Sequence, residues 1–210
     1  MAENKESKVF YGLSNVHYAK LTETTDPDTG VVTTSYDTPK KWPGAVNIQL
    51  DPSGNPTFFS ADNIAYYALA NNRGYEGDYE CASIPEDVQL DTLGRVKDDN
   101  GLIVETDKDE VSYFALLFEF ETDISARRYC FYKVCLAQRP SVASETVDVN
   151  SDLSVKTEKV SFRAVPRTDA VTIDGVEKHL VKCCTGKDTT PEAYADFYSS
   201  VPQPSFEGGS

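Results

Sequence analysis

The sequence predicts a mainly β protein, a β-sandwich or barrel with one flanking α-helix at residues 84–93 and extended loops or arms. Three observations lead to this prediction. Many short segments alternate apolar and polar residues with a period of two, which is typical of strands. Gly, Pro, Asn and Asp separate these segments at intervals of about 8–12 residues. One segment alone has both the start and the stop signals of a stable helix.

The most apolar continuous stretch, residues 113–136, predicts a central β-hairpin. Alternate residues on each side of a short polar break at 122–125 are bulky and apolar, and successive side chains of a strand point to opposite faces. We therefore expect these two rows to share one face of the sheet and to form the core. The rows are Phe114, Leu116, Phe118 and Phe120, then Cys130, Tyr132, Val134 and Leu136.

The opposite face of this hairpin mixes aromatic and charged residues, whereas a solvated face would be mostly polar. Leu117, Tyr129 and Phe131 lie there beside acidic Glu119 and Glu121. Basic residues follow on the second strand, so that Arg127 is a candidate partner of the second glutamate. Two alternatives stay open: a helix or loop of the same chain, such as the helix at 85–93, covers this face, or the face meets another subunit.

The residues before the hairpin supply further strands. Residues 9–21 and 31–36 flank the turn-rich segment 22–30 and predict a projecting hairpin. Residues 45–50 alternate, a DPSGNP turn follows, and 57–60 are expected to pair back onto them. Residues 63–70 and 79–82 are expected to be strands, with a turn at 74–78 between them, and 102–105 a short strand.

The helix at 84–93 has recognisable ends. Ser83 and Glu86 have the spacing of a capping box, Pro85 suits the first turn, and Gly94 suits the stop. Its expected apolar side is Val88, Leu90 and Leu93.

The C-terminal third is predicted to contain strands at 155–165 and 177–184. In the first of these, Val160, Phe162 and Ala164 share a face. Residues 191–201 predict a short helix capped by Thr190, with one aromatic side made of Tyr194, Phe197 and Tyr198. The expected organisation is a flexible N-terminal arm at 1–8, a β domain at 9–185, and a C-terminal arm at 186–210 with the short helix.

Composition narrows the possible functions. The chain has 210 residues and a formal net charge of −14, so phosphate-directed binding of nucleic acid is disfavoured. Five cysteines, an odd number, follow an N-terminus without an apolar signal segment, which predicts synthesis in a reducing compartment with free thiols. The longest apolar run is too short to span a membrane.

No pattern of catalytic or metal-ligating residues stands out. A nucleophile elbow, an HExxH motif, a P-loop and a dinucleotide fingerprint are all absent from the sequence. Asp26, Asp28 and Gly30 match a fragment of a calcium loop, but the remainder of that pattern is missing, so a turn is the expected role. We expect no enzyme activity, no metal and no cofactor.

Several segments, in their order and spacing, resemble the major tail protein family of long-tailed phages of Gram-positive bacteria. Within Trp42–Gly94 the resemblance lies in WPGAVNIQLDPSGNPTFFSADNIAYYALANNRGYEGDYECASIPEDV. It continues in VFYGLSNVHYAKLT, DDNG, FALLFEFETDISARRYCFY and LAQRP, and covers residues 8–170.

The resemblance implies a structural virion protein with the tail-tube type of β-sandwich or barrel. Such subunits polymerise as stacked hexameric rings and form the conduit through which phage DNA is ejected. The implied partners are further copies of the chain, the tape measure protein, the tail terminator and distal tail or baseplate proteins, with DNA only in transit and no membrane. The implied location is the phage tail, after synthesis and assembly in the bacterial host cytoplasm.

The resemblance implies no catalytic residue to transfer, so the candidate positions concern assembly. Candidate subunit-interface residues are Leu117, Tyr129, Phe131, Asp26, Asp28 and Phe206, and candidate acidic residues of the lumen are Glu119 and Glu121. The alternative is a soluble β-sandwich binding module, namely a phage decoration or host-recognition domain.

Overall fold

The computed structural model describes residues 8–54, 57–61, 64–69, 71–122, 124–141 and 156–206. The side chains of residues 57–61 and 64–69 are not described. Most of the predicted N-terminal arm and the last four residues of the predicted C-terminal arm lie outside this range.

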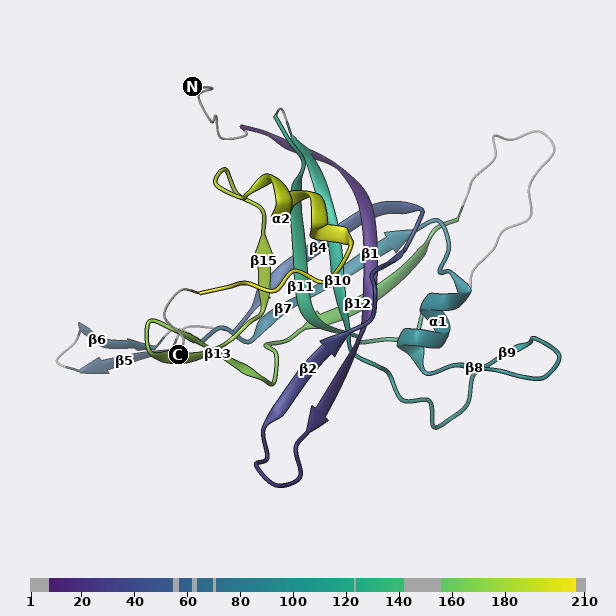
Figure 1. Ribbon diagram of the computed structural model, residues 1–210, viewed down its shortest axis with the longest axis horizontal. Helices are drawn as coiled ribbons and strands as arrows, with labels where there is room; N and C mark the ends of the chain where they lie inside the picture. Colours follow the sequence, from purple (N-terminus) through teal and green to yellow (C-terminus); the bar gives the residue numbers. More distant parts are fainter. Residues whose placement is uncertain are drawn as a thin grey trace.

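One large antiparallel sheet dominates the fold (Figure 1). Its strands follow the order β2-β1-β10-β11-β12-β7-β4, and β3 and β15 add to β1 and β11. Their bounds are β1 Phe10–Thr25, β2 Val32–Tyr36, β3 Lys40–Lys41, β4 Ala45–Ser53, β7 Gly74–Cys81, β10 Phe114–Thr122, β11 Arg127–Leu136, β12 Glu158–Ala164 and β15 Lys182–Cys184.

Three small two-stranded hairpins extend from this sheet. They are β5 Thr57–Ala61 with β6 Ile64–Leu69, β8 Val96–Lys97 with β9 Ile103–Val104, and β13 Ala170–Ile173 with β14 Val176–His179. The helical elements are α1 Glu86–Leu93, α2 Pro191–Ala195 and the 3₁₀ helix η1 Asp196–Tyr198. The mainly β fold with a flanking helix is thus as the sequence predicts.

The sheet bends so that β1 and β4 approach each other and enclose the main core, as in a β-sandwich. Trp42 lies in this core, 1% exposed, with its ring centroid 4.9 Å from that of Tyr79 at an interplanar angle of 83°. Tyr18 makes a second edge contact with the same indole at 6.2 Å. Offset and edge contacts of this kind are favourable for buried aromatic pairs.

The central hairpin forms as predicted, but one of its two apolar rows is wrong. Phe114 pairs with Val134 whereas Leu116 pairs with Phe131, so β11 has one more residue than β10 between these positions. Such a bulge reverses the facing of the residues that precede it. Phe131 therefore packs in the main core with Val134, and Cys130 and Tyr132 lie on the other face.

Helix α1 starts without the predicted capping box. Pro85 is the N-cap residue and no side chain among the described residues caps the helix, while the Ile84 N–H donates to the Glu158 carboxylate of β12. This contact lies just before the helix, so the predicted capping box of Ser83 and Glu86 is wrong. Gly94 ends the helix with φ 72°, as predicted, since a left-handed C-cap favours glycine.

Two strand predictions near β4 are also corrected. Residues 57–61 pair with β6 instead of β4, and the two residues between β5 and β6 are the commonest length of a hairpin loop. The predicted turn at 74–78 is part of β7. Gly77 lies in mid-strand where a Cβ atom would collide with the Gln49 carbonyl oxygen of β4, so this glycine permits a close approach of two backbones.

The predicted strand at 177–184 is divided into β14, which pairs with β13, and β15, which pairs with β11, whereas the first hairpin and β12 agree with the sequence. Residues 9–21 and 31–36 form the β1–β2 hairpin, which projects from the sheet in Figure 1, although β1 continues to Thr25 and the turn is shorter than predicted. Val160, Phe162 and Ala164 of β12 are all buried on one face.

We expect Phe131→Ala to lower the free energy of unfolding by about 3–5 kcal/mol, because the ring is 2% exposed and contacts Phe118 and Tyr75. Urea unfolding followed by circular dichroism measures the loss. The matched control is Phe10→Ala, at a ring that is 48% exposed, which should cost less than about 1 kcal/mol. Equal losses in the two variants would contradict the bulged register.

Candidate assembly surfaces

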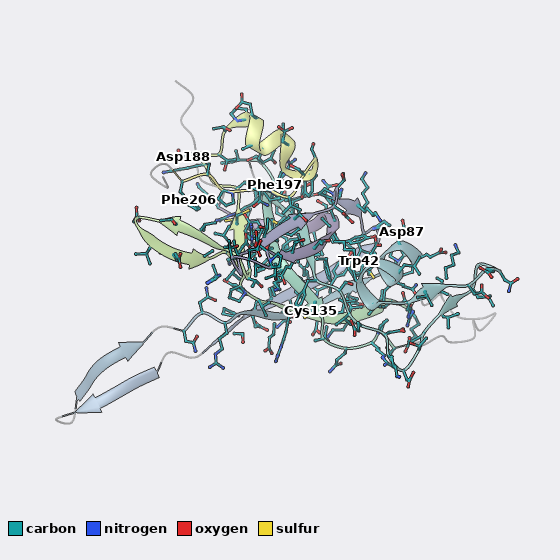
Figure 2. The ribbon with its side chains drawn as sticks, turned by 60° about the horizontal axis from the view of Figure 1, so that its bottom comes forward. Trp42, Asp87, Cys135, Asp188, Phe197 and Phe206 are labelled. Carbon is teal, nitrogen blue, oxygen red and sulfur yellow. The ribbon has the colours of Figure 1, made fainter. Side chains whose placement is uncertain are left out.

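The outer face of β1, β10 and β11 is covered by the C-terminal segment of the same chain, residues 186–206. Phe197 and Val201 of this segment pack on Ala19, Ala115 and Leu117 and form a second core. Figure 2 shows Phe197 below α2, against the sheet. Of the two alternatives for this face, coverage by the same chain is therefore observed, but by the C-terminal segment and not by α1.

The short helical segment that covers this face forms as the sequence predicts. Pro191 begins α2, and the Thr190 hydroxyl accepts a hydrogen bond from the Ala193 N–H at 3.2 Å. Phe197 is buried and Tyr198 packs against the second core. An amphipathic segment too short to be stable alone is thus stabilised by what it covers.

A buried ion pair fastens this segment to the sheet. Arg128 Nε donates to Glu119 Oε2 at 3.0 Å, and the two side chains are 17% and 8% exposed. The guanidinium also lies 3.8 Å from the ring centroid of Tyr194 and donates to the carbonyl oxygen of the same residue. The Tyr198 hydroxyl donates to Glu119 at 3.2 Å. We call these four residues the C-terminal clasp.

His17 extends the clasp on its β1 side. Its ring stacks on Tyr198 with centroids 4.6 Å apart, and burial lowers its pKa below the usual 6.5 despite the nearby Glu119. Lys41, which also lowers this pKa, faces it from β3.

A second polar cluster ties the β1–β2 hairpin to the sheet. Lys133 Nζ donates to Glu23 Oε1 and to Thr168 Oγ1, both at 2.6 Å. Burial of Glu23 raises its pKa, but its interactions with Lys133 and Thr168 outweigh burial and the pKa is lowered overall. Nearby, Arg167 and Thr34 both donate hydrogen bonds to the Asp169 carboxylate. These contacts fix the base of the β1–β2 hairpin, while its tip projects.

The candidate interface residues are spread over the molecule. Leu117 is in the second core, Phe131 is in the main core, and Tyr129 stacks on Phe118 with centroids 5.4 Å apart. Asp26 and Asp28 lie exposed at the tip of the β1–β2 hairpin, and Phe206 is 39% exposed at the end of the described chain.

At the hairpin tip, Asp26 is used for the turn. Its carboxylate accepts the N–H groups of Asp28 and Thr29 at 2.8 and 2.9 Å, and these bonds lower its pKa. Within the described residues, no group of three or more His, Cys, Asp or Glu residues is arranged to hold a metal ion.

The two candidate lumen residues differ in exposure. Glu121 is exposed, whereas Glu119 is buried and engaged in the clasp. The sequence pattern names Glu121 and Arg127 as a cross-strand pair, but the register of the bulged hairpin places Glu119 opposite Arg128. The sequence analysis thus missed the pairing of Arg128 with Glu119. The signal that could have found it is the presence of opposite charges on the two strands of one hairpin, near its turn.

Exposed apolar side chains gather in two groups that the sequence did not indicate. The first, which we call the β1 end group, lies where β1 starts beside the β10–β11 turn. The second, the β8–β9 group, lies on and around that hairpin, which Figure 1 shows on the far side of α1 from the sheet. The β1 end group comprises Val9, Phe10, Tyr11 and Ile124, which are 52%, 48%, 54% and 54% exposed. The β8–β9 group comprises Val96, Leu102, Val104 and Val111, which are 54%, 63%, 37% and 49% exposed.

A hollow of about 220 Å³ lies beside the β8–β9 group. Leu93, Val111 and Leu136 contribute apolar surface to it, while Arg95 and Arg139 both pair with Glu105 along its wall. None of the described helices has the length and apolar character needed to cross a membrane.

Comparison with known proteins does not show which family this chain belongs to. No family model and no curated protein matches the chain. Among solved structures, a chain in the cryo-EM structure of the anti-feeding prophage baseplate, symmetrised six-fold, is 8% identical and has a TM-score of 0.39. The alignment covers 84% of this chain and 96% of that one.

We expect Arg128→Ala to lower the free energy of unfolding by about 3 kcal/mol, because Glu119 would keep a buried charge without its partner. Guanidinium unfolding measures this loss, and hydrogen exchange should show faster opening of α2. Arg163→Ala is the matched control, since its pair with Glu76 is 59% and 51% exposed and should contribute less than about 1 kcal/mol. Unchanged exchange in α2 would show that the clasp does not hold the segment.

We expect stability to fall as the pH drops below 6.5 because of His17. Its pKa is lowered in the folded state, so the unfolded chain binds a proton first and is favoured by acid. Unfolding measured in steps between pH 7.5 and about 5 should show this fall, and His17→Asn should reduce it. His179→Asn, at the exposed end of β14, serves as the control and should retain the fall. The same pH slope in both variants would rule out His17 as its origin.

Proposed function

We propose that this chain is a structural subunit of a phage tail, the major tail-tube protein, which polymerises as stacked rings around a channel for DNA. The observation that carries the proposal is the pair of exposed apolar groups at different places on one subunit. The β1 end group and the β8–β9 group each expose four large apolar side chains. Exposed apolar patches on a folded chain commonly mark interaction sites.

Two different patches on one chain favour head-to-tail association. When one patch binds the other on the next copy, the contact is heterologous, and repetition closes a ring or extends a filament. A single self-complementary patch would stop at a dimer. The hollow next to the β8–β9 group offers a concave surface, partly apolar at Leu93, Val111 and Leu136, for side chains of the β1 end group.

Open strand edges add to this support. β4 ends the order of the large sheet, and in the described part of the chain it pairs only with β7. Such an edge presents backbone donors and acceptors to a neighbouring chain. The projecting β1–β2 hairpin, with Asp26 and Asp28 exposed at its tip, is suited to contact a copy in the next ring, and Phe206 and Tyr129 remain further interface candidates.

The charge of the subunit suits a channel that passes DNA without retaining it. A net charge of −14 opposes binding to phosphates, which needs Lys and Arg to displace counterions. Glu121 is an exposed carboxylate available for such a wall, whereas Glu119 is already neutralised by Arg128. The tape measure protein, the tail terminator and baseplate proteins are the partners that this role requires.

We expect concentrated protein, alone or with a tail-assembly initiator, to form rings or tubes of uniform diameter in negative-stain electron microscopy. Tyr11→Asp and Leu102→Asp should each give folded monomers, because each places a charge in one apolar group. Val176→Asp, at an exposed valine outside both groups, is the control that should still assemble. Monomers from the unaltered protein under both conditions would contradict the proposal.

Mixing the two variants separates a head-to-tail contact from a symmetric one. Each variant keeps one intact group, so a mixture of Tyr11→Asp and Leu102→Asp should form heterodimers and stop there. Sedimentation velocity distinguishes these species. If Leu102→Asp alone dimerised, the β1 end group would bind itself and the ring model would fail.

A further inference from the structure

Two cysteines from distant parts of the chain face each other beneath the C-terminal segment. Cys130 of β11 and Cys183 of β15 are direct partners in the antiparallel register. Hydrogen bonds on either side, from the Thr185 N–H to the Arg128 carbonyl at 2.9 Å and from the Tyr132 N–H to the Val181 carbonyl at 3.1 Å, fix that register. The Cα atoms of such a pair lie about 5.5 Å apart. This spacing lies within the range that disulfides span.

The two thiols differ in access and acidity. Both belong to the second core, but Cys130 is fully buried whereas Cys183 is partly exposed. The neighbouring Cys130 lowers the pKa of Cys183, while burial raises the pKa of Cys130. Cys183 is thus the thiol that a reagent from solution meets first and the one more readily present as thiolate.

We propose that Cys130 and Cys183 form a reversible disulfide that fastens β15, and with it the C-terminal segment, to β11. The oxidant is a small disulfide such as glutathione disulfide. The Cys183 thiolate attacks it, forms a mixed disulfide and releases one glutathione thiolate. The Cys130 thiolate then attacks Cys183 Sγ and releases the second glutathione. Two protein thiols are oxidised and one small disulfide is reduced to two thiols, which take up the two protons that the protein thiols lose.

The position of β15 gives this bond its effect. β15 is a three-residue strand that pairs only with β11 among the described strands. The C-terminal segment starts at residue 186, directly after β15, and closes over the second core. A short strand held on one edge opens locally at low cost, and such opening admits the oxidant to Cys130. Once formed, the bond prevents β15 from separating and slows the release of the segment.

The other cysteines provide internal controls. Cys184 is exposed and lies next to Cys183. Because neighbouring residues of a strand point to opposite faces, Cys184 points away from Cys130 and cannot take the place of Cys183 in the pair. It receives a hydrogen bond from Arg127 at 3.4 Å on that other face. Cys135 is on β11 beyond the bulge, opposite Arg163 of β12.

The test treats the isolated chain with excess glutathione disulfide, counts thiols after denaturation and maps the cross-linked peptide by mass spectrometry. Cys184→Ser, which leaves the pair intact, should still lose two thiols to an intramolecular bond between Cys130 and Cys183. Cys183→Ser and Cys130→Ser should form no such bond. Because the unaltered chain yields the peptide map by itself, the result does not depend on whether the serine variants fold.

The oxidised protein should melt about 5–10 °C higher than the reduced one, and a dithiol reductant should reverse the shift. Hydrogen exchange in α2 should slow as well. Oxidation that joins Cys184 to another molecule, or to Cys183, while Cys130 stays reduced would overturn the proposal. The measurement uses monomers, so its outcome is independent of whether the chain forms tubes.

Discussion

Pairing of β10 with β11 is the interaction on which both hydrophobic cores depend. Each strand is apolar on two faces, which is unusual in a sheet with one solvated side. The inner face supplies Phe118 and Phe131 to the main core, and the outer face supplies Leu117 and Cys130 to the second. Because the bulge in β11 decides which residues face which core, the two cores are not independent: a change in register would move aromatic rings out of both at once.

The sequence predicted the parts of this fold that local patterns determine. The hairpin at 113–136, the β1–β2 hairpin, the end of α1 at Gly94 and the Thr190 cap all follow from periodicity and turn chemistry within a few residues. The bulge in β11 could not be predicted, because the apolar and polar pattern of β11 has no feature that indicates an extra residue. The start of α1 was mispredicted because the spacing of Ser83 and Glu86 indicates a capping box, whereas the helix has Pro85 as its N-cap residue.

The candidate surfaces were only partly predictable. The mixed outer face of the hairpin was recognised as one that needs a cover, but a segment about 80 residues further along provides it, and sequence spacing does not specify long-range contacts. The clasp joins Glu119 and Arg128, which are close in the hairpin, to Tyr194 and Tyr198, which are not. The two exposed apolar groups escaped notice because a valine or leucine in a short strand indicates burial unless the tertiary structure shows otherwise.

The C-terminal cover has a consequence for the order of synthesis. α2 and η1 follow β15 in the chain, so on the ribosome Leu117 and its neighbours are made long before the residues that bury them. Until Phe197 and Val201 emerge, the nascent sheet presents an apolar face to which other chains could adhere. Completion of the second core is therefore among the last steps of folding. A chain interrupted before this point would be a target for chaperones and proteases.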